Sequence, residues 1–151
     1  MVNVGSSRVK ARNATRVSTI KNLQTAVEMY YDSVGSYPST NGLTYFSYGV
    51  ENSTCWGGGL VKAVYIPGVV PDYISQLPQD PNPTTCGTGY IYRSNGTDYK
   101  IQAHNPEGDC MNPAYASMRD PARTGGGVYA PGYPPDFCWS WAVYSPGGKD
   151  Y

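Results

Sequence analysis

The sequence VSTIKNLQTAVEMYYDSV, residues 17–34, carries the clearest structural signal in this chain. Its apolar residues recur at spacings of three and four, which places them on one stripe of an α-helix: Ile20, Leu23, Val27, Tyr30 and Val34. Residues 9–34 contain no glycine or proline, and Gly35 followed by Pro38 forms a helix stop. We therefore predict a helix over residues 9–34, about 39 Å long at a rise near 1.5 Å per residue. Only its second half carries a stripe that could pack on a domain.

The first half of this helix is basic. Five cations precede the first acidic residue, Glu28: Arg8, Lys10, Arg12, Arg16 and Lys21. One interpretation is a solvated helix end, which is what such charge runs usually are. The other is an end that projects from the domain toward a membrane surface or a partner subunit. The sequence alone leaves both open.

The overall composition indicates one folded, loop-rich domain spanning residues 1–151. The 11 basic residues balance 11 acidic residues, so the whole chain is not a nucleic-acid binder by charge. It contains 18 glycines, 13 prolines and 15 tyrosines, a composition typical of turns and β surface rather than of a linker.

Four cysteines are present: Cys55, Cys86, Cys110 and Cys138. They form no CxxC pair and the chain has a single histidine, His104, so a zinc site is disfavoured. An even count in loop-like sequence favours two disulfides and an oxidising compartment. Four cysteines allow three connectivities, and we predict the sequential one, Cys55–Cys86 and Cys110–Cys138, because it staples two loops that have little periodic structure. The sequence has no signal peptide or membrane span, so we expect the precursor to carry an export segment before Met1.

Residues 89–103, GYIYRSNGTDYKIQA, predict a β-hairpin. The Asn95-Gly96 dipeptide favours a two-residue type I′ turn. The implied register pairs Ser94 with Thr97, Arg93 with Asp98, Tyr92 with Tyr99, Ile91 with Lys100, and Tyr90 with Ile101. We predict that Tyr92, Tyr99 and Ile101 face the helix residues Ile20, Leu23, Val27 and Tyr30. Arg93, Asp98 and Lys100 would lie on the opposite face, where replacing Lys100 by alanine should cost almost nothing.

The rest of the chain shows weaker patterns. Residues 35–89 read as one long elaborated loop, in which 60–66 could be a short helix or strand and 77–83 are extended. Residues 110–138 form a second long loop between two cysteines, and residues 139–144 alternate like a strand.

The residues that could carry chemistry are few. His104 has no nucleophile or GxSxG motif to partner it, so we expect a structural or surface role and no enzyme activity. Glu107, Asp109 and Asp120 could supply oxygen ligands to Ca²⁺, but no EF-hand pattern is present. The glycine clusters lack the P-loop ending. We therefore predict no catalytic residues, no metal and no cofactor.

Four segments in this order resemble the type IV pilins and type II secretion pseudopilins: residues 11–38, ARNATRVSTIKNLQTAVEMYYDSVGSYP; 71–83, PDYISQLPQDPNP; 89–103; and 139–148, WSWAVYSPGG. The resemblance implies an α+β domain in which a long N-terminal helix packs on an antiparallel sheet of three or four strands. On this basis residues 35–89 are the αβ-loop, 90–103 the hairpin, and 110–138 the disulfide-bounded loop. The chain lacks the family's cleavage motif, and the calcium-binding acids of some pseudopilins have no residue-by-residue match here.

The resemblance also implies a function. A hydrophobic N-terminal helix half, absent from this sequence, would anchor the precursor in the inner membrane with its domain in the periplasm. After processing and N-terminal methylation, it would pack in the centre of a helical filament assembled with other pilins and the membrane machinery. The expected function is a structural subunit of a type IV pilus or pilus-like filament. A secretion pseudopilin is the first alternative. A secreted carbohydrate-binding or hydrolytic module using His104 is the second, and it leaves the helix pattern unexplained.

Overall fold

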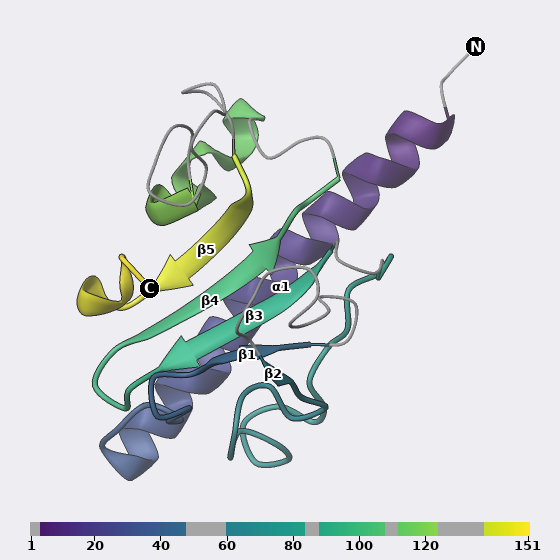
Figure 1. Ribbon diagram of the computed structural model, residues 1–151. Helices are drawn as coiled ribbons and strands as arrows, with labels where there is room; N and C mark the ends of the chain where they lie inside the picture. The colour runs from purple at the N-terminus through teal and green to yellow at the C-terminus, as the bar shows by residue number, and fades with distance from the viewer. Residues whose placement is uncertain (1–3, 48–59, 84–87, 108–111, 124–137) are drawn as a thin grey trace.

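The fold consists of one long helix lying on one face of a five-stranded sheet (Figure 1). The computed structural model describes residues 4–47, 60–83, 88–107, 112–123 and 138–151. The helix is α1 (Val4–Val34), and the strands are β1 (Thr44–Phe46), β2 (Leu60–Val61), β3 (Gly89–Ser94), β4 (Tyr99–His104) and β5 (Ser140–Tyr144). Three short 3-10 helices complete the described elements: η1 (Pro113–Met118), η2 (Pro121–Arg123) and η3 (Pro146–Gly148). The α+β class and the packing of the helix on the sheet agree with the prediction.

The sheet differs from the prediction in size and in strand direction. Its order is β2-β1-β3-β4-β5, and β1 pairs with β2 in parallel, whereas the other neighbours are antiparallel. The expected sheet of three or four antiparallel strands is therefore wrong. The extra strand is β2, whose two residues are too few to show a period-2 pattern in the sequence.

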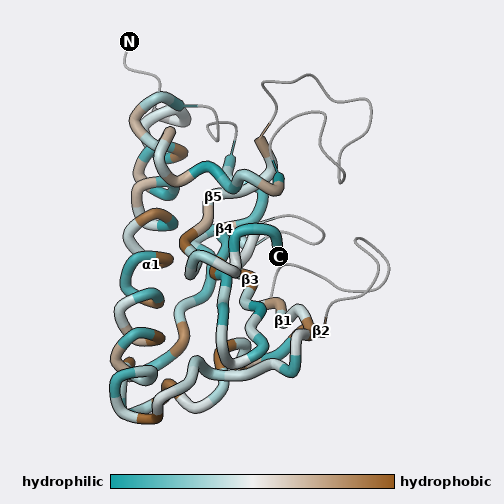
Figure 2. Tube along the Cα trace, turned by 90° about the vertical axis from the view of Figure 1, so that its left-hand side faces the viewer, coloured by the Kyte–Doolittle hydropathy of each residue, from teal (hydrophilic) through white to brown (hydrophobic). Residues whose placement is uncertain are grey.

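Helix α1 begins at Val4, five residues before the predicted start, and ends at Val34 as predicted. Gly35 follows with a φ of +80°, the left-handed conformation that glycine adopts easily, and its N–H donates to the carbonyl of Tyr31 at 2.7 Å. Figure 2 shows the helix as a separate layer along the left side of the domain, with the sheet to its right.

The β3–β4 hairpin is shifted from the predicted register by two residues. Ser94 lies opposite Tyr99, and Arg93 lies opposite Lys100. A type I′ turn needs a positive φ at both central residues. Gly96 has one, at 93°, but Asn95 does not.

The physical reason for the shift lies in the side chains of residues 95–98. The Asn95 side chain accepts hydrogen bonds from the N–H groups of Thr97 and Asp98 at 2.9 and 2.8 Å, which closes a longer turn. The Asp98 carboxylate accepts from Ser145 Oγ at 2.7 Å and from the N–H of Gly147 at 3.0 Å, so it does not face Arg93 across the ladder. A two-residue shift keeps every side chain on its face, because side chains alternate with a period of two.

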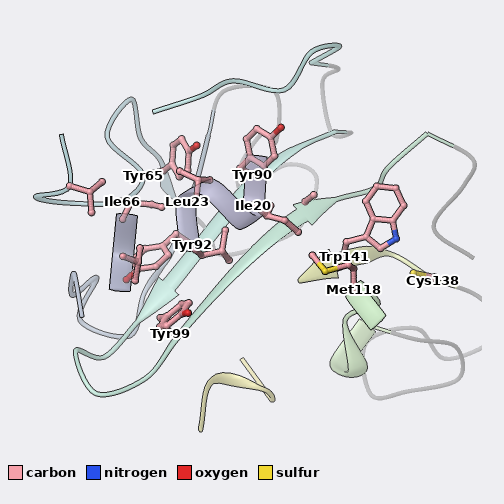
Figure 3. Close-up of a cluster of buried hydrophobic side chains, with 14 residues drawn as sticks. Ile20, Leu23, Tyr65, Ile66, Tyr90, Tyr92, Tyr99, Met118, Cys138 and Trp141 are labelled. Atoms are coloured by element: carbon pink, nitrogen blue, oxygen red, sulfur yellow. The ribbon is translucent and has the colours of Figure 1, made fainter. Parts of the chain in front are cut away.

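The main core lies between α1 and the sheet (Figure 3). Residues with no solvent exposure come from the helix and from the facing side of β3, β4 and β5: Ile20, Leu23, Val27, Tyr90, Tyr92, Tyr99, Ile101 and Trp141. Tyr30 is partly buried against this cluster, and Tyr65, Ile66 and Val69 of the loop after β2 join it. Fully burying each aliphatic residue contributes roughly 1.5–3 kcal/mol. The helix residues and the sheet residues that were predicted to face each other therefore lie in one cluster. Val34, the last residue of the predicted stripe, is instead 54% exposed.

The opposite face of β4 is buried as well. Lys100, Gln102 and His104 alternate with the core residues and are 1%, 3% and 4% exposed. The described segments that bond to this face include Asp120 and the chain around Lys149. The expectation that Lys100 points into solvent is therefore wrong.

Candidate functional site

The stripe of α1 continues toward the N-terminus with polar residues instead of apolar ones. Asn13 and Arg16 are fully buried, and with Ile20 and Leu23 they keep the spacing of three and four residues. Arg16 is one of the largest fully buried side chains that the structure describes. The first half of the helix thus has a domain-facing side, contrary to the expectation from its lack of apolar residues.

Arg16 meets Asp80 of the loop between β2 and β3 in a two-point contact. Nε of Arg16 donates to Oδ2 of Asp80, and Nη2 donates to Oδ1, each at 2.7 Å. Neither side chain has any solvent exposure. Paired N–H groups of a guanidinium match the two oxygens of a carboxylate, which makes this the strong form of the ion pair. The carboxylate also accepts from the N–H of Asn82 at 2.9 Å, which shapes the turn after Pro81.

Glu107, which follows β4, completes the cluster. Its carboxylate accepts from Nε and Nη2 of Arg12 at 2.6 Å each, and from Nη1 of Arg16 at 2.8 Å. The Nδ2 group of Asn13 donates to the main-chain oxygen of Glu107 at 3.0 Å, and that of Asn82 donates to the carboxylate at 3.1 Å. We call the set Arg12, Asn13, Arg16, Asp80, Asn82 and Glu107 the ionic anchor.

The charges of the ionic anchor stabilise one another. The two hydrogen bonds from Arg12, together with the one from Arg16, lower the pKa of Glu107 from 4.5 to about 2. Burial alone would lower the pKa of Arg16, but the hydrogen bonds and charges of Asp80 and Glu107 outweigh it, so the pKa is raised. Both shifts favour the charged forms of Arg16 and Glu107 at neutral pH.

The ionic anchor joins three segments that are far apart in the sequence, and it marks where α1 leaves the domain. Residues 5–8 and Lys10 lie beyond it and are exposed. In Figure 1 the first turns of the helix extend past the ends of the strands. Of the five early cations, Arg16 is buried in its ion pair with Asp80, and Arg12 is partly buried in its ion pair with Glu107. The other three are exposed: Arg8, Lys10 and Lys21.

The far end of α1 is fixed by a carboxylate that two tyrosines share. Glu28 accepts from the hydroxyl of Tyr99 at 2.6 Å and from that of Tyr37 at 3.1 Å. Burial, with the Glu28 charge, raises the pKa of Tyr37 to about 12, and burial with the hydrogen bond to Glu28 raises the pKa of Tyr99 as well, so both phenols stay protonated. The helix is thus tied to the sheet by polar contacts at both ends of its apolar stripe.

The two described acids that were weighed as calcium ligands are each engaged with a different partner. Glu107 belongs to the ionic anchor, Asp120 is paired with Lys100, and Asp109 lies outside the described residues. Within the described ranges, no group of three or more His, Cys, Asp or Glu side chains could hold a metal ion. His104 stacks on Trp139 at 6.4 Å between ring centroids and is nearly buried.

The predicted disulfides fall mostly outside the described residues. Cys138 is disulfide-bonded and lies at the edge of the core cluster. Cys55, Cys86 and Cys110 are not described, so the predicted connectivity stays a prediction.

Comparison with known proteins identifies no relative: no family model, curated protein or solved structure matches this chain. Among the described residues, no helix combines the length and apolar character needed to cross a bilayer.

Proposed function

We propose that this domain is a structural subunit of a type IV pilus or pilus-like filament. The observation that carries the proposal is the double character of α1. From Asn13 to Tyr30 one side of the helix is held by the ionic anchor and the apolar core, whereas residues 5–8 are exposed beyond the sheet. A domain on its own has no use for a helical projection of this kind, but a polymer can bundle such projections in its centre.

The assembly follows from this shape. The helix would continue into the hydrophobic segment that the family resemblance implies for the precursor. That segment would hold the subunit in the inner membrane with its domain in the periplasm, and then pack against the same segment of neighbouring subunits. Head-to-tail contacts that do not close generate a helical filament. The sheet and the two long loops would face outward, and other pilins and the membrane machinery would be the partners.

A type II secretion pseudopilin is the alternative within this class, because the same helix would serve a periplasmic pseudopilus. A carbohydrate-binding or hydrolytic module is disfavoured by the burial of His104, which is 4% exposed against the ring of Trp139. A substrate arriving from solvent could not reach that imidazole without displacing the chain around it.

The test is to express the full-length precursor together with pilus or secretion machinery and to look for filaments by electron microscopy. Filaments are expected with the hydrophobic segment, and none from the domain alone. The matched control is a known pilin in the same strain. If that pilin polymerises while the precursor stays dispersed in the membrane, the proposal is overturned. A hydrolytic activity that disappears with His104→Ala would support the enzyme alternative instead.

A further inference from the structure

A second buried ion pair lies on the face of the sheet turned away from α1. Nζ of Lys100 on β4 is 2.7 Å from Oδ1 of Asp120, which lies between η1 and η2, and the two side chains are 1% and 0% exposed. The proposed filament assembly requires neither group. A buried pair of this kind gains little stability over well-packed apolar residues, so stability alone does not account for it.

The carboxylate of Asp120 is held by donors on both oxygens. Oδ2 accepts from Nε2 of Gln102 and from Oγ of Ser140, the latter at 3.1 Å. Oδ1 accepts from the N–H of Ala122 at 3.0 Å. When a nucleophile adds to a carboxyl carbon, negative charge collects on oxygen, and fixed donors such as those on Oδ2 stabilise it.

The orientation of the Lys100 amine is also fixed by hydrogen bonds. Its Nζ donates to the main-chain oxygens of Lys149 and Tyr151 at 2.7 and 2.9 Å. A neutral amine keeps two protons, and giving them to these two oxygens turns its lone pair toward Asp120. Burial lowers the pKa of Lys100, so less free energy is needed to reach the neutral form.

We propose that Lys100 and Asp120 condense into an intramolecular amide bond between β4 and the η1–η2 turn. A proton passes from Nζ to Oδ1 along the existing hydrogen bond, and Nζ then attacks Cγ. The Nζ–Cγ bond forms, the Cγ–Oδ1 bond breaks, and Oδ1 leaves as water with two protons that came from Nζ. The ammonium and carboxylate become one neutral amide and one water, so no oxidant, cofactor or second reactant is needed. The fixed approach of the two groups supplies the effective concentration that drives such reactions.

The amide would replace two buried charges by one neutral group. It would also fasten residues 119–123 to the centre of the sheet. The inference does not depend on the filament proposal, because it concerns one chain by itself.

The first test is the intact mass of the purified, fully reduced wild-type chain. We expect it to be lighter than the sequence mass by one water molecule, and Lys100→Arg and Asp120→Ala chains to have their full sequence masses. Dehydration of Asp120 to a succinimide is not an alternative source of this loss, because the next residue, Pro121, has no N–H. The wild-type measurement needs no folded variant, and a wild-type chain of full sequence mass overturns the proposal.

The second test locates the bond. Trypsin should fail to cut after Lys100, and tandem mass spectrometry should find a branched peptide joining Lys100 to Asp120. Acid treatment of the denatured chain adds an internal control, because Asp–Pro bonds are cleaved through a free aspartate side chain. The chain should break at Asp80–Pro81 but not at Asp120–Pro121. A linear tryptic peptide ending at Lys100, or acid cleavage at both sites, overturns the proposal.

Discussion

Arg16 on α1 and Asp80 in the loop before β3 bind each other through two hydrogen bonds of 2.7 Å, and neither side chain touches solvent. A pair this deep is only weakly screened by salt, unlike an ion pair on the surface. Removing one partner would strand the other charge in a medium that cannot solvate it.

We therefore expect Arg16→Ala to destabilise the domain by about 3–5 kcal/mol. Arg8→Ala is the matched control, because Arg8 is on the same helix but exposed, and it should change stability by at most about 0.5 kcal/mol. Urea unfolding followed by circular dichroism measures both. Equal midpoints for the two variants would show that the buried pair contributes nothing.

The partner substitution tests whether the cost comes from the stranded charge. The chain carrying Arg16→Met and Asp80→Leu together should lose less stability than the two single variants summed, because neither charge is left alone. Purely additive losses in a double-mutant cycle would contradict this reading of the ionic anchor.

The pKa of Glu107 predicts a dependence on acid. Folding lowers this pKa from 4.5 to about 2. The ionised carboxylate therefore contributes its full stabilisation at pH values above the pKa of the unfolded chain, and this stabilisation is lost as the pH falls through the pKa of the folded chain. Glu107→Gln should cost about 1–3 kcal/mol at pH 7, since it leaves Arg12 and Arg16 one charged acceptor short. The free-energy difference between the variant and the wild type should shrink as the pH is lowered from 5 to 2. A difference that stays constant over this range would exclude the ionised carboxylate as its source.

The apolar half of the helix stripe gives a separate prediction. Leu23→Ala should cost about 2–5 kcal/mol, because Leu23 has no exposure and its removal leaves a cavity against the sheet. Met29 on the same helix is 48% exposed, so Met29→Ala should have little effect. Thermal melts that coincide would place the wrong face of α1 on the sheet.

The structure predicts that replacing Lys100 destabilises the domain, whereas the sequence predicted almost no effect. Lys100→Ala should cost about 3–5 kcal/mol, because it leaves the Asp120 carboxylate buried without a partner, whether the wild-type chain holds the two groups as an ion pair or as the proposed amide. The exposed Lys21→Ala serves as the control and should be close to neutral. A Lys100→Ala domain that unfolds at the wild-type denaturant concentration would show that this face of β4 is open to solvent.

The disulfide connectivity can be read by peptide mapping without reduction. We expect peptides joining Cys55 to Cys86 and Cys110 to Cys138. Closing the second loop should stabilise the fold by roughly 3–4 kcal/mol in the chain-entropy model. A peptide joining Cys86 to Cys110 would refute the sequential pairing.

The sequence predicted the elements whose signal is local and periodic. Ile20, Leu23 and Val27 identified the buried side of α1, and the alternation around Asn95-Gly96 identified both hairpin strands and their inner face. The register could not be predicted, because it depends on Asn95 and Asp98 finding partners in their own turn and in Ser145. A charge match between Arg93 and Asp98 was too weak a signal against those hydrogen bonds.

The ionic anchor was missed for a different reason. Asn13 and Arg16 continue the spacing of the apolar stripe. A polar residue at such a position predicts the end of the buried stripe unless a buried partner for it is known. That partner, Asp80, lies 64 residues away in a proline-rich segment with no periodic pattern. The spacing of 13, 16, 20 and 23 was the available clue. Lys100 was predicted to be exposed for a similar reason, because the segments that cover it, around Asp120 and Lys149, have no sequence pattern that indicates burial.

The change of chemistry along α1 has a mechanical consequence. Apolar burial has no directional requirement, so an apolar stripe alone fixes the position of a helix along its axis less strictly than paired hydrogen bonds do. A shift of α1 by one helical turn, about 5.4 Å, would separate both donors of Arg16 from Asp80. The apolar half of α1 therefore holds the helix against the sheet, and Arg16 fixes its position along the helix axis. That position sets how far the helix reaches beyond the domain, so every copy of the chain has a projection of the same length.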